Sequence, residues 1–588
     1  MTVPPEELRT ADGFPPTTRE RWRELALGVL RKSGIETDSP EEALSSTTYD
    51  GVTIAPLYDS SDLPGDPGLP GAAPYVRGAR PVGGWDVRQR HEVADREAVL
   101  ADLENGVTSL WLTLEPEDLP RVLGEEIYLD LVPIVLDAGE RTAEAAGTLF
   151  ALAERRGVAR GGLTGNLGAD PVRDPATAAE LARRCAADFP GLRAVVVDGT
   201  PYHDMGGGDA EELGCATAAG VAALRTLTGA GLPVEEAFGQ LEFRYAATAD
   251  QFLTIAKLRA ARRVWARVAE VCGARENAGQ RQHAVTGSAM MTARDPWVNM
   301  LRTTLACFAA GAGGADAVTV QPFDACLGLP DAFARRIARN THALLVEEAG
   351  TARVTDPAGG SWYVERLTED LAGKAWEWFQ EIERAGGMAA AVESGLVSGR
   401  IAATWRERSG NIAHRRDPIT GVSEFPDLGE RPLSRPPRPH PRSGVRYAQE
   451  FEALRDLADA QEVRPAVFLA VIGPVAAHTA RASFAANLFN AGGVAALTAP
   501  VPPGGTVDPA AIAAAFAASG ARIACLCSSD RLYGEHAEAV AAALREAGAA
   551  KVWLAGRGDH AGVDATVHAG CDALGVLRTI FDDLEVAR

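Results

Sequence analysis

Hydrophobic and polar positions alternate in a regular order along most of the chain. Between about residues 100 and 380, short apolar stretches are separated by longer stretches with apolar residues at helical spacing. The predicted strands are Ser109–Leu114, Val132–Leu136, Gly162–Thr164, Ala194–Val197, Leu241–Tyr245, Gln282–Val285, Ala317–Val320 and a weak one near Ala352–Thr355. Strands that alternate with helices over this length predict an α/β fold, a (β/α)8 TIM barrel, with a doubly wound open sheet as the competing architecture.

A second alternation of strands and helices begins at residue 464. Its predicted strands are Val467–Ile472, Val494–Leu497, Arg522–Leu526, Val552–Ala555 and Ala573–Val576. Short repeats of this kind predict a flavodoxin-like doubly wound sheet, which binds ligands beyond the carboxyl ends of its strands. The first such turn carries His478, and a helix is predicted to open near Arg481.

The remaining segments have their own patterns. Residues 16–33 have apolar positions at helical spacing. Residues 36–90 are rich in Pro, Gly, Asp and Ser, which favours an arm lying across another surface; a partly disordered leader is the alternative. Prolines and arginines in 429–446 predict a semi-rigid linker. The expected domains are therefore 1–90, a helix and arm for subunit contact; 91–425, the barrel; 426–463, the linker and a helix; and 464–588, the flavodoxin-like domain.

Composition narrows the classes of partner and compartment. A net charge of -21 argues against binding to nucleic acid or to anionic membranes. No run approaches the roughly 20 apolar residues of a membrane helix, and the N-terminal sequence lacks the apolar core of a signal peptide. The eight cysteines are scattered, and the close pair Cys525 and Cys527 lacks a zinc-binding spacing. These features predict a cytoplasmic protein with reduced thiols and no metal site.

Several long segments resemble one family of enzymes. They are QFLTIAKLRAARRVWARV (Gln251–Val268), RQHAVTGSAMMTARDPWVNMLRTT (Arg281–Thr304), DAFARRIARNTHALLVEEAGTARVTDPAGGSWYVERLT (Asp331–Thr368), PYVRGARP (Pro74–Pro81) and WDVRQR (Trp85–Arg90). They resemble the methylmalonyl-CoA mutase family of adenosylcobalamin-dependent isomerases, with the last two just before the barrel. The resemblance implies a barrel threaded by the pantetheine chain of an acyl-CoA and a C-terminal domain resembling the cobalamin-binding domain.

The resemblance also locates the positions that carry the family's chemistry. Arg90 stands where catalytic chains have a tyrosine, and its guanidinium is larger, always charged and costly to bury without a partner. Gly165 replaces a glutamine that would hydrogen-bond the thioester. His203 matches the histidine that donates to the substrate carbonyl, so it is the one vestigial match in the barrel.

The predicted cobalamin site has similar losses. His478 matches the family's cobalt-ligating histidine, but the flanking Asp and Gly of the Asp-x-His-x-x-Gly motif are Ala476 and Arg481 here. In two later turns, Asp530 places a charge where an apolar residue belongs, and Arg557 places a long cation at the exit of the cobalamin tail. His478 is therefore expected to be a vestigial match, and no catalytic, cofactor-binding or metal-binding residue is expected on this chain.

The resemblance then implies a role in an assembly. It points to the small (beta) subunit of a heterodimeric methylmalonyl-CoA mutase, which interconverts methylmalonyl-CoA and succinyl-CoA. The homologous large subunit would carry the adenosylcobalamin and bind the acyl-CoA substrate. Two alternatives are an independently active cobalamin-dependent acyl-CoA mutase and a regulatory module that binds an acyl-CoA.

Overall fold

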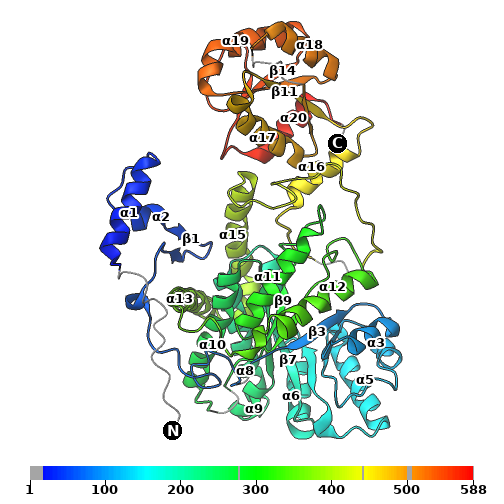
Figure 1. Ribbon diagram of the computed structural model, residues 1–588. Coiled ribbons are helices and arrows are strands. Elements are labelled where there is room, and N and C mark those ends of the chain that lie inside the picture. The colour runs from blue at the N-terminus through cyan, green and yellow to red at the C-terminus, as the bar shows by residue number, and fades with distance from the viewer. Residues whose placement is uncertain (1–16, 82, 276–277, 440–442, 500–505, 587–588) are drawn as a thin grey trace, which may run out of the picture.

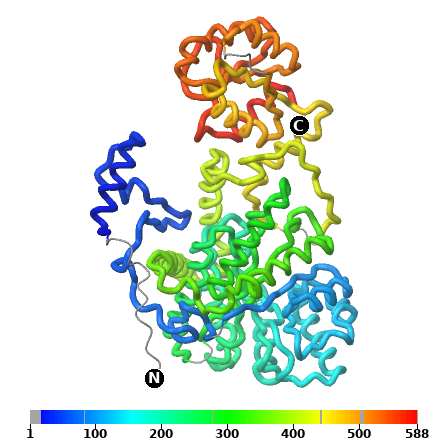
Figure 2. The backbone as a smooth tube through the Cα atoms, viewed as in Figure 1, coloured from blue at the N-terminus to red at the C-terminus, as the bar shows by residue number. Residues whose placement is uncertain are grey.

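A computed structural model describes residues 17–81, 83–275, 278–439, 443–499 and 506–586 (Figure 1). Three parts follow one another along the chain: an N-terminal arm, a large barrel domain and a smaller α/β domain. The smaller domain lies beyond one end of the barrel, and the yellow segment that contains the linker runs between the two (Figure 2). Both predicted domain folds are confirmed.

The barrel consists of parallel strands that close in the order β10-β3-β4-β5-β6-β7-β8-β9. The strands are β3 Asp86–His91, β4 Ser109–Leu112, β5 Ile134–Leu136, β6 Gly165–Ala169, β7 Leu192–Asp198, β8 Leu241–Ala247, β9 Gln282–Thr286 and β10 Ala317–Thr319. Because the strands close into a barrel, the doubly wound open sheet, which was the alternative prediction from the sequence, is excluded.

Three strand predictions in this domain need correction. The first strand is β3, which the sequence placed just before the barrel, because its inward positions carry arginines and make it look like a polar loop. The weak strand near Ala352–Thr355 is instead a 3-10 turn, Thr351–Arg353, outside the barrel. The chain there is anchored by Asp356, which binds Arg77 and Arg259. The strand predicted at Gly162–Thr164 lies a few residues later, as β6.

Helices surround the barrel, the inner ones packed against its strands and the others against those inner helices or the C-terminal domain. They are α3 Arg96–Glu104, α4 Leu119–Val122, α5 Thr142–Arg155, α6 Pro175–Asp188, α7 Thr200–Asp204, α8 Asp209–Gly229, α9 Val234–Gly239, α10 Gln251–Cys272, α11 Val298–Ala312, α12 Ala332–Ala343, α13 Trp362–Arg384, α14 Met388–Glu393 and α15 Leu396–Ala413. Helix α10 shows how sequence sets the bounds. Asp250 accepts a hydrogen bond from the Leu253 amide at its start, and Gly273 ends it with a φ of 76°.

The arm has a free part and a packed part. Helices α1 (Arg19–Lys32) and α2 (Pro40–Leu44) stand away from the barrel (Figure 1), followed by the antiparallel hairpin of β1 (Ser46–Thr47) and β2 (Thr53–Ile54). Beyond β1 the arm lies along the barrel of its own chain, where Arg80 pairs with Asp316. Residues 1–16 of the predicted arm segment lie outside the described residues.

The C-terminal sheet is parallel, in the order β12-β11-β13-β14-β15. Its elements, after linker helix α16 (Gln449–Asp459), are β11 Ala466–Val471, α17 Val475–Ala491, β12 Ala495–Thr498, α18 Pro509–Ser519, β13 Ile523–Cys527, α19 Asp530–Glu546, β14 Lys551–Ala555, β15 Ala565–Val567 and α20 Ala573–Asp583. This is the flavodoxin-like order.

Two predictions in the C-terminal domain are wrong. The segment Ala573–Val576 is the start of α20, because Asp572 caps the helix by accepting a hydrogen bond from the Gly575 amide. The fifth strand is β15, which precedes it. Helix α17 begins at Val475 and not near Arg481, so His478 lies in its first turn and not in a loop.

In the part of the chain that the structure describes, no helix combines the length and the apolar character needed to cross a membrane.

Candidate functional site

An ion pair occupies the interior of the barrel. Side chains of a strand point alternately to its two faces, and Arg88 on β3 and Glu242 on β8 meet inside although their strands are not neighbours. Arg88 Nη1 donates to Glu242 Oε1 over 2.6 Å, and both side chains are buried. Burial acts to raise the pKa of Glu242, but the positive charges of Arg88, Arg193 and Arg281 together outweigh it and hold the pKa below its ordinary value. Glu242 is therefore charged.

A cation and aromatic cluster forms the next level of the barrel interior and lines a cavity of about 280 Å³ at the barrel mouth. The Arg244 guanidinium lies 4.0 Å from the ring centre of Trp111 and donates to Asp198 over 2.7 Å. The Arg90 guanidinium lies 4.4 Å from the same ring and donates to Thr113 Oγ1 over 3.1 Å. The partners of Arg90 thus include an indole face, a hydroxyl group and the carboxylate of Glu92, whose Oε1 atom lies 3.5 Å from Arg90 Nη2.

Gly165 has no room for any side chain. It lies at the start of β6 with a φ of 123°, and a Cβ atom there would approach the carbonyl oxygen of Ile134 to 2.0 Å. The strand is irregular at this point: the neighbouring Asn166 side chain accepts a hydrogen bond from the Gly168 amide and donates to the Val195 carbonyl. The local backbone therefore leaves no room for the glutamine side chain that the resemblance led us to expect at this position in catalytic chains.

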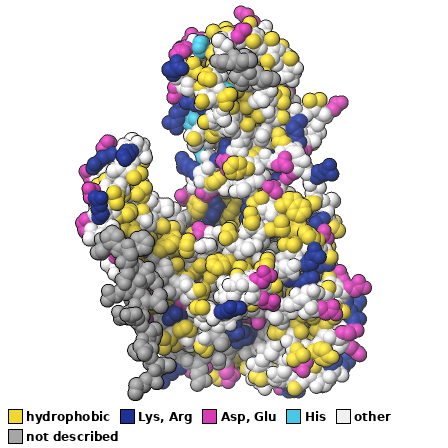
Figure 3. Space-filling model, viewed as in Figure 1, with side chains coloured by type: hydrophobic (Ala, Val, Ile, Leu, Met, Phe, Trp, Pro, Cys, Tyr) yellow, Lys and Arg dark blue, Asp and Glu magenta, His cyan; other side chains and the backbone are white. Residues whose placement is uncertain are grey.

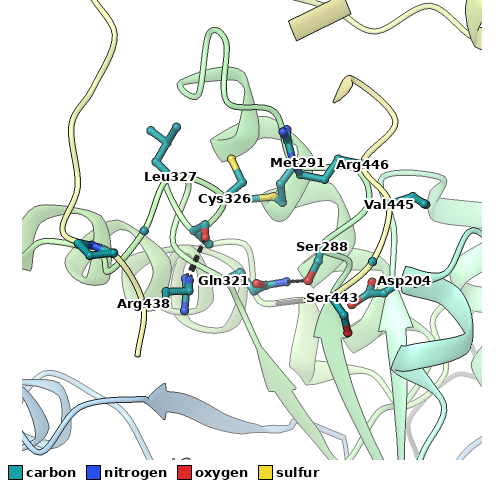
Figure 4. Close-up of a pocket in the computed structure, with 14 residues that line it drawn as sticks. Asp204, Ser288, Met291, Gln321, Cys326, Leu327, Arg438, Ser443, Val445 and Arg446 are labelled. Carbon is teal, nitrogen blue, oxygen red and sulfur yellow. Dashed lines mark hydrogen bonds between the residues drawn. The ribbon is translucent and has the colours of Figure 1, made fainter. Parts of the chain in front are cut away.

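The linker lies over the end of the barrel where TIM-barrel enzymes bind their substrates. The Val445 amide donates to the Asp204 carbonyl over 2.7 Å, and Arg438 donates to the Ala325 carbonyl over 2.9 Å. Between linker and barrel is a cavity of about 350 Å³ (Figure 4). The close-up shows Ser288 and Gln321 hydrogen-bonded to each other at its floor. The barrel mouth is thus partly closed by the chain itself.

His203 lies in α7, directly after β7, and is only 2% exposed. Its Nδ1 atom is 3.9 Å from Glu212 Oε2, which is too far for a hydrogen bond. Among the described residues, neither ring nitrogen has a hydrogen-bond partner. Burial, together with the charge of Lys257, lowers the pKa of His203 to about 3, so the ring is neutral. His203 lines a cavity beside the arm and not the cavity under the linker.

His478 lies on the buried face of α17, together with Ala485 and Phe489. It is 7% exposed, and within the described ranges neither of its ring nitrogens finds a hydrogen-bond partner. Burial lowers its pKa, which keeps the ring neutral. Ala476, two residues earlier, can offer the imidazole no hydrogen bond.

Side chains occupy the edge of the C-terminal sheet next to His478. Arg481 donates to Asp530 over 2.6 Å, and its guanidinium lies 5.1 Å from the ring centre of Tyr533. The Tyr533 hydroxyl donates to the Ala555 carbonyl and accepts from the Ser528 amide. This buried tyrosine joins the carboxyl ends of β13 and β14, and the sequence analysis did not single it out.

The whole chain was compared with known proteins. A family model described as methylmalonyl-CoA mutase matches residues 115–487, more than half of the chain. The chain belongs to the methylmalonyl-CoA mutase family. The resemblance predicted from the sequence is therefore confirmed.

Several mutase-family relatives match nearly their full length. A methylmalonyl-CoA mutase small subunit from Streptomyces virginiae is 58% identical, with all of both chains covered. A probable methylmalonyl-CoA mutase small subunit from Mycobacterium tuberculosis H37Rv is 44% identical over 92% of each chain. The small subunit from Propionibacterium freudenreichii subsp. shermanii is 39% identical over 99% of this chain and 97% of its own.

The sequence analysis missed most of the mutase-like barrel's interior. Arg88, Glu242 and Arg244 were not singled out, although a signal was present. In β8 the charged Glu242 and Arg244 alternate with Phe243 and Tyr245, so two successive positions on one face of a buried strand carry charges. Charges at every second position of a central barrel strand indicate ion pairs inside the barrel.

Proposed function

We propose that this chain is the small subunit of a heterodimeric methylmalonyl-CoA mutase. In this proposal it has no catalytic residues of its own and supports a homologous large subunit, which holds adenosylcobalamin and the acyl-CoA in the cytoplasm. The names of its full-length relatives support the subunit assignment. The observation that carries the proposal is the filled barrel, because a pantetheine chain would need the space that Arg88, Trp111 and Glu242 occupy.

The C-terminal domain supports a cobalamin-free role for this chain. A cobalt ligand must present a ring nitrogen at the edge of the sheet, whereas His478 is buried on the inner face of α17. A cobalamin tail would also need open space beside Gly556, where a Cβ atom would already lie 2.8 Å from the Arg481 guanidinium. These residues do not fit cobalamin, so we assign this chain no step of the isomerisation.

The arm supports a contact with the large subunit. Helix α1 exposes Leu25 and Val29, which are 54% and 64% accessible, and Leu44 of α2 is also exposed. Hydrophobic side chains lie on the side of the arm that faces the barrel across open space (Figure 3). An apolar face without a partner among the described residues is typical of a subunit interface.

The proposal is tested by co-purifying this chain with a catalytic mutase chain and measuring cobalamin on the complex. One cobalamin per heterodimer supports it. Two per heterodimer would overturn it, as would a cobalamin absorbance spectrum on this chain alone.

The arm contact has its own test. Val29→Asp should weaken association with the large subunit at least tenfold, because it places a charge in an apolar interface. Val271→Asp is the matched control, since Val271 is 68% exposed at the far end of α10. Equal association constants for the two variants would contradict a role for α1.

A further inference from the structure

A second cavity lies beside the barrel, at the base of the arm. It has a volume of about 700 Å³, within the range of small-molecule sites. Its walls come from the arm hairpin, the N-terminal ends of α8 and α10, helices α11 and α15, and Tyr447. We call it the arm cavity. It is separate from the barrel mouth, which is lined by other residues under the linker.

Two nitrogen-bearing side chains in the arm cavity lack hydrogen-bond partners within the described residues. One is His203, whose two ring nitrogens are buried and unpaired. The other is Arg408 of α15, which forms no ion pair with any described residue and whose Nε atom is buried without an acceptor there. The Arg408 guanidinium lies 4.2 Å from the ring centre of Tyr49 and 5.1 Å from that of Tyr447, so aromatic contacts fix its position.

Most carboxylates that line or adjoin the cavity are already paired; the exception among the described residues is Glu407, an exposed side chain next to Arg408 in the sequence. Lys257 Nζ binds Asp209 Oδ1 and Glu212 Oε2, each over 2.8 Å. Although His203, Asp209 and Glu212 are close enough together to suggest a metal site, the ammonium group occupies the position between the two carboxylates. The cluster is therefore no cation site.

Three acids on the other walls also have partners. Asp50 accepts hydrogen bonds from the Asp209 and Ala210 amides over 3.1 and 2.9 Å. Asp250 accepts from the Leu253 amide, and Asp417 accepts from the Tyr49 hydroxyl. Within the described part of the chain, none of these acids accepts a hydrogen bond from Arg408 or His203.

We propose that the arm cavity binds a small organic carboxylate, with its oxygens on Arg408 and His203 and its apolar part against Tyr49 and Tyr447. A planar guanidinium matches a carboxylate, and hydrogen bonds between charged groups are the strong ones. The nearby negative charges favour a monoanion over a dianion, because each added charge on the ligand faces Asp209 and Asp417. The site uses no group of the barrel interior, so the test of this proposal does not depend on the proposed mutase role.

The probe is butyrate, added to the full-length chain and followed by saturation-transfer NMR and titration calorimetry. Saturable binding is expected. Butyramide, its neutral isostere, and the dianion succinate should each bind at least tenfold more weakly. Failure of butyrate to bind, or tighter binding of butyramide or succinate, would overturn the proposal.

Matched variants locate the site. Arg408→Gln should weaken butyrate binding at least tenfold, while Arg406→Gln should leave it unchanged, since Arg406 lies exposed on the same helix. His203→Gln should also weaken binding, and the His203 ring nitrogen signals should shift on adding butyrate to the parent chain. Unfolding midpoints identify a variant that has lost its fold. If the variant Arg408→Gln is folded and binds as tightly as Arg406→Gln, the assignment is wrong.

Discussion

Replacing Gly165 by alanine tests whether the lost glutamine position is closed by the backbone itself. The new Cβ atom would lie 2.0 Å from the Ile134 carbonyl oxygen, and no flexible side chain can move aside to relieve the contact. A non-glycine residue at a φ of 123° is also strained by about 1–3 kcal/mol. Overpacking in a closed barrel adds a further ~1–3 kcal/mol. The expected loss of stability is therefore about 2–6 kcal/mol.

The assay is thermal unfolding of the full-length chain, with the barrel transition followed separately because the chain has two domains. At about 2 °C per kcal/mol for a large domain, the midpoint should fall by roughly 4–12 °C. Gly147→Ala is the control: Gly147 is exposed in α5, and nothing lies within 4 Å of its added Cβ atom. That change should be neutral or stabilising by up to about 1 kcal/mol.

Gly165→Gln is predicted to be at least as damaging as Gly165→Ala. It would not restore the hydrogen bond to the thioester that the resemblance implies, because the backbone at this position has no room for a Cβ atom. A barrel midpoint for Gly165→Ala within 1 °C of that of Gly147→Ala would refute this reasoning.

Three further changes test the other sites. Arg88→Met should cost about 3–5 kcal/mol by leaving Glu242 buried and unpaired, whereas the double change with Glu242→Leu should recover most of the loss in the same melt. Burial, followed by the charge of Asp209, raises the pKa of Asp50 from 3.8 to about 7, so the folded state binds this proton more tightly. The free energy of unfolding should thus fall as the pH rises from about 4 to 7, and Asp50→Asn should flatten that decline; an unchanged slope would argue against it. His478→Ala should change the activity of the complex by less than about twofold, and a loss of about 100-fold would restore His478 as a cobalt ligand.

The sequence predicted both domain folds because strand-length apolar runs and helical spacing are set locally. The prediction failed for a strand whose inward-facing positions carry charged residues instead of apolar ones. The segment Asp86–His91 has Arg88 and Arg90 at its inward positions, so it resembles a loop, although those charges are paired inside the barrel. Ala573–Val576 failed for another reason, because an apolar run of four residues fits a strand or a helix, and the cap at Asp572 decides.

At the candidate sites too, the residue types could be read from the sequence, whereas the contacts between distant residues required the fold. The sequence could show that Gly165 lacks a side chain, but only the position of Ile134 in the neighbouring strand shows that none can be added. It could show that Arg481 replaces a glycine, but not that the arginine would reach Asp530 of another helix. The arm cavity was invisible, since His203 and Arg408 are joined only by the fold.

A barrel filled by its own side chains has a consequence for folding. A barrel that holds its ligand along the axis is stabilised by that ligand, since binding to the folded state alone shifts the folding equilibrium. Here Arg88, Glu242 and Trp111 supply contacts inside the barrel from the chain itself. Both partners of the ion pair are needed, because removing one leaves a buried charge that the rest of the interior cannot solvate. These contacts would let the barrel hold its shape with neither acyl-CoA nor cofactor, which is the property that the proposed supporting role requires.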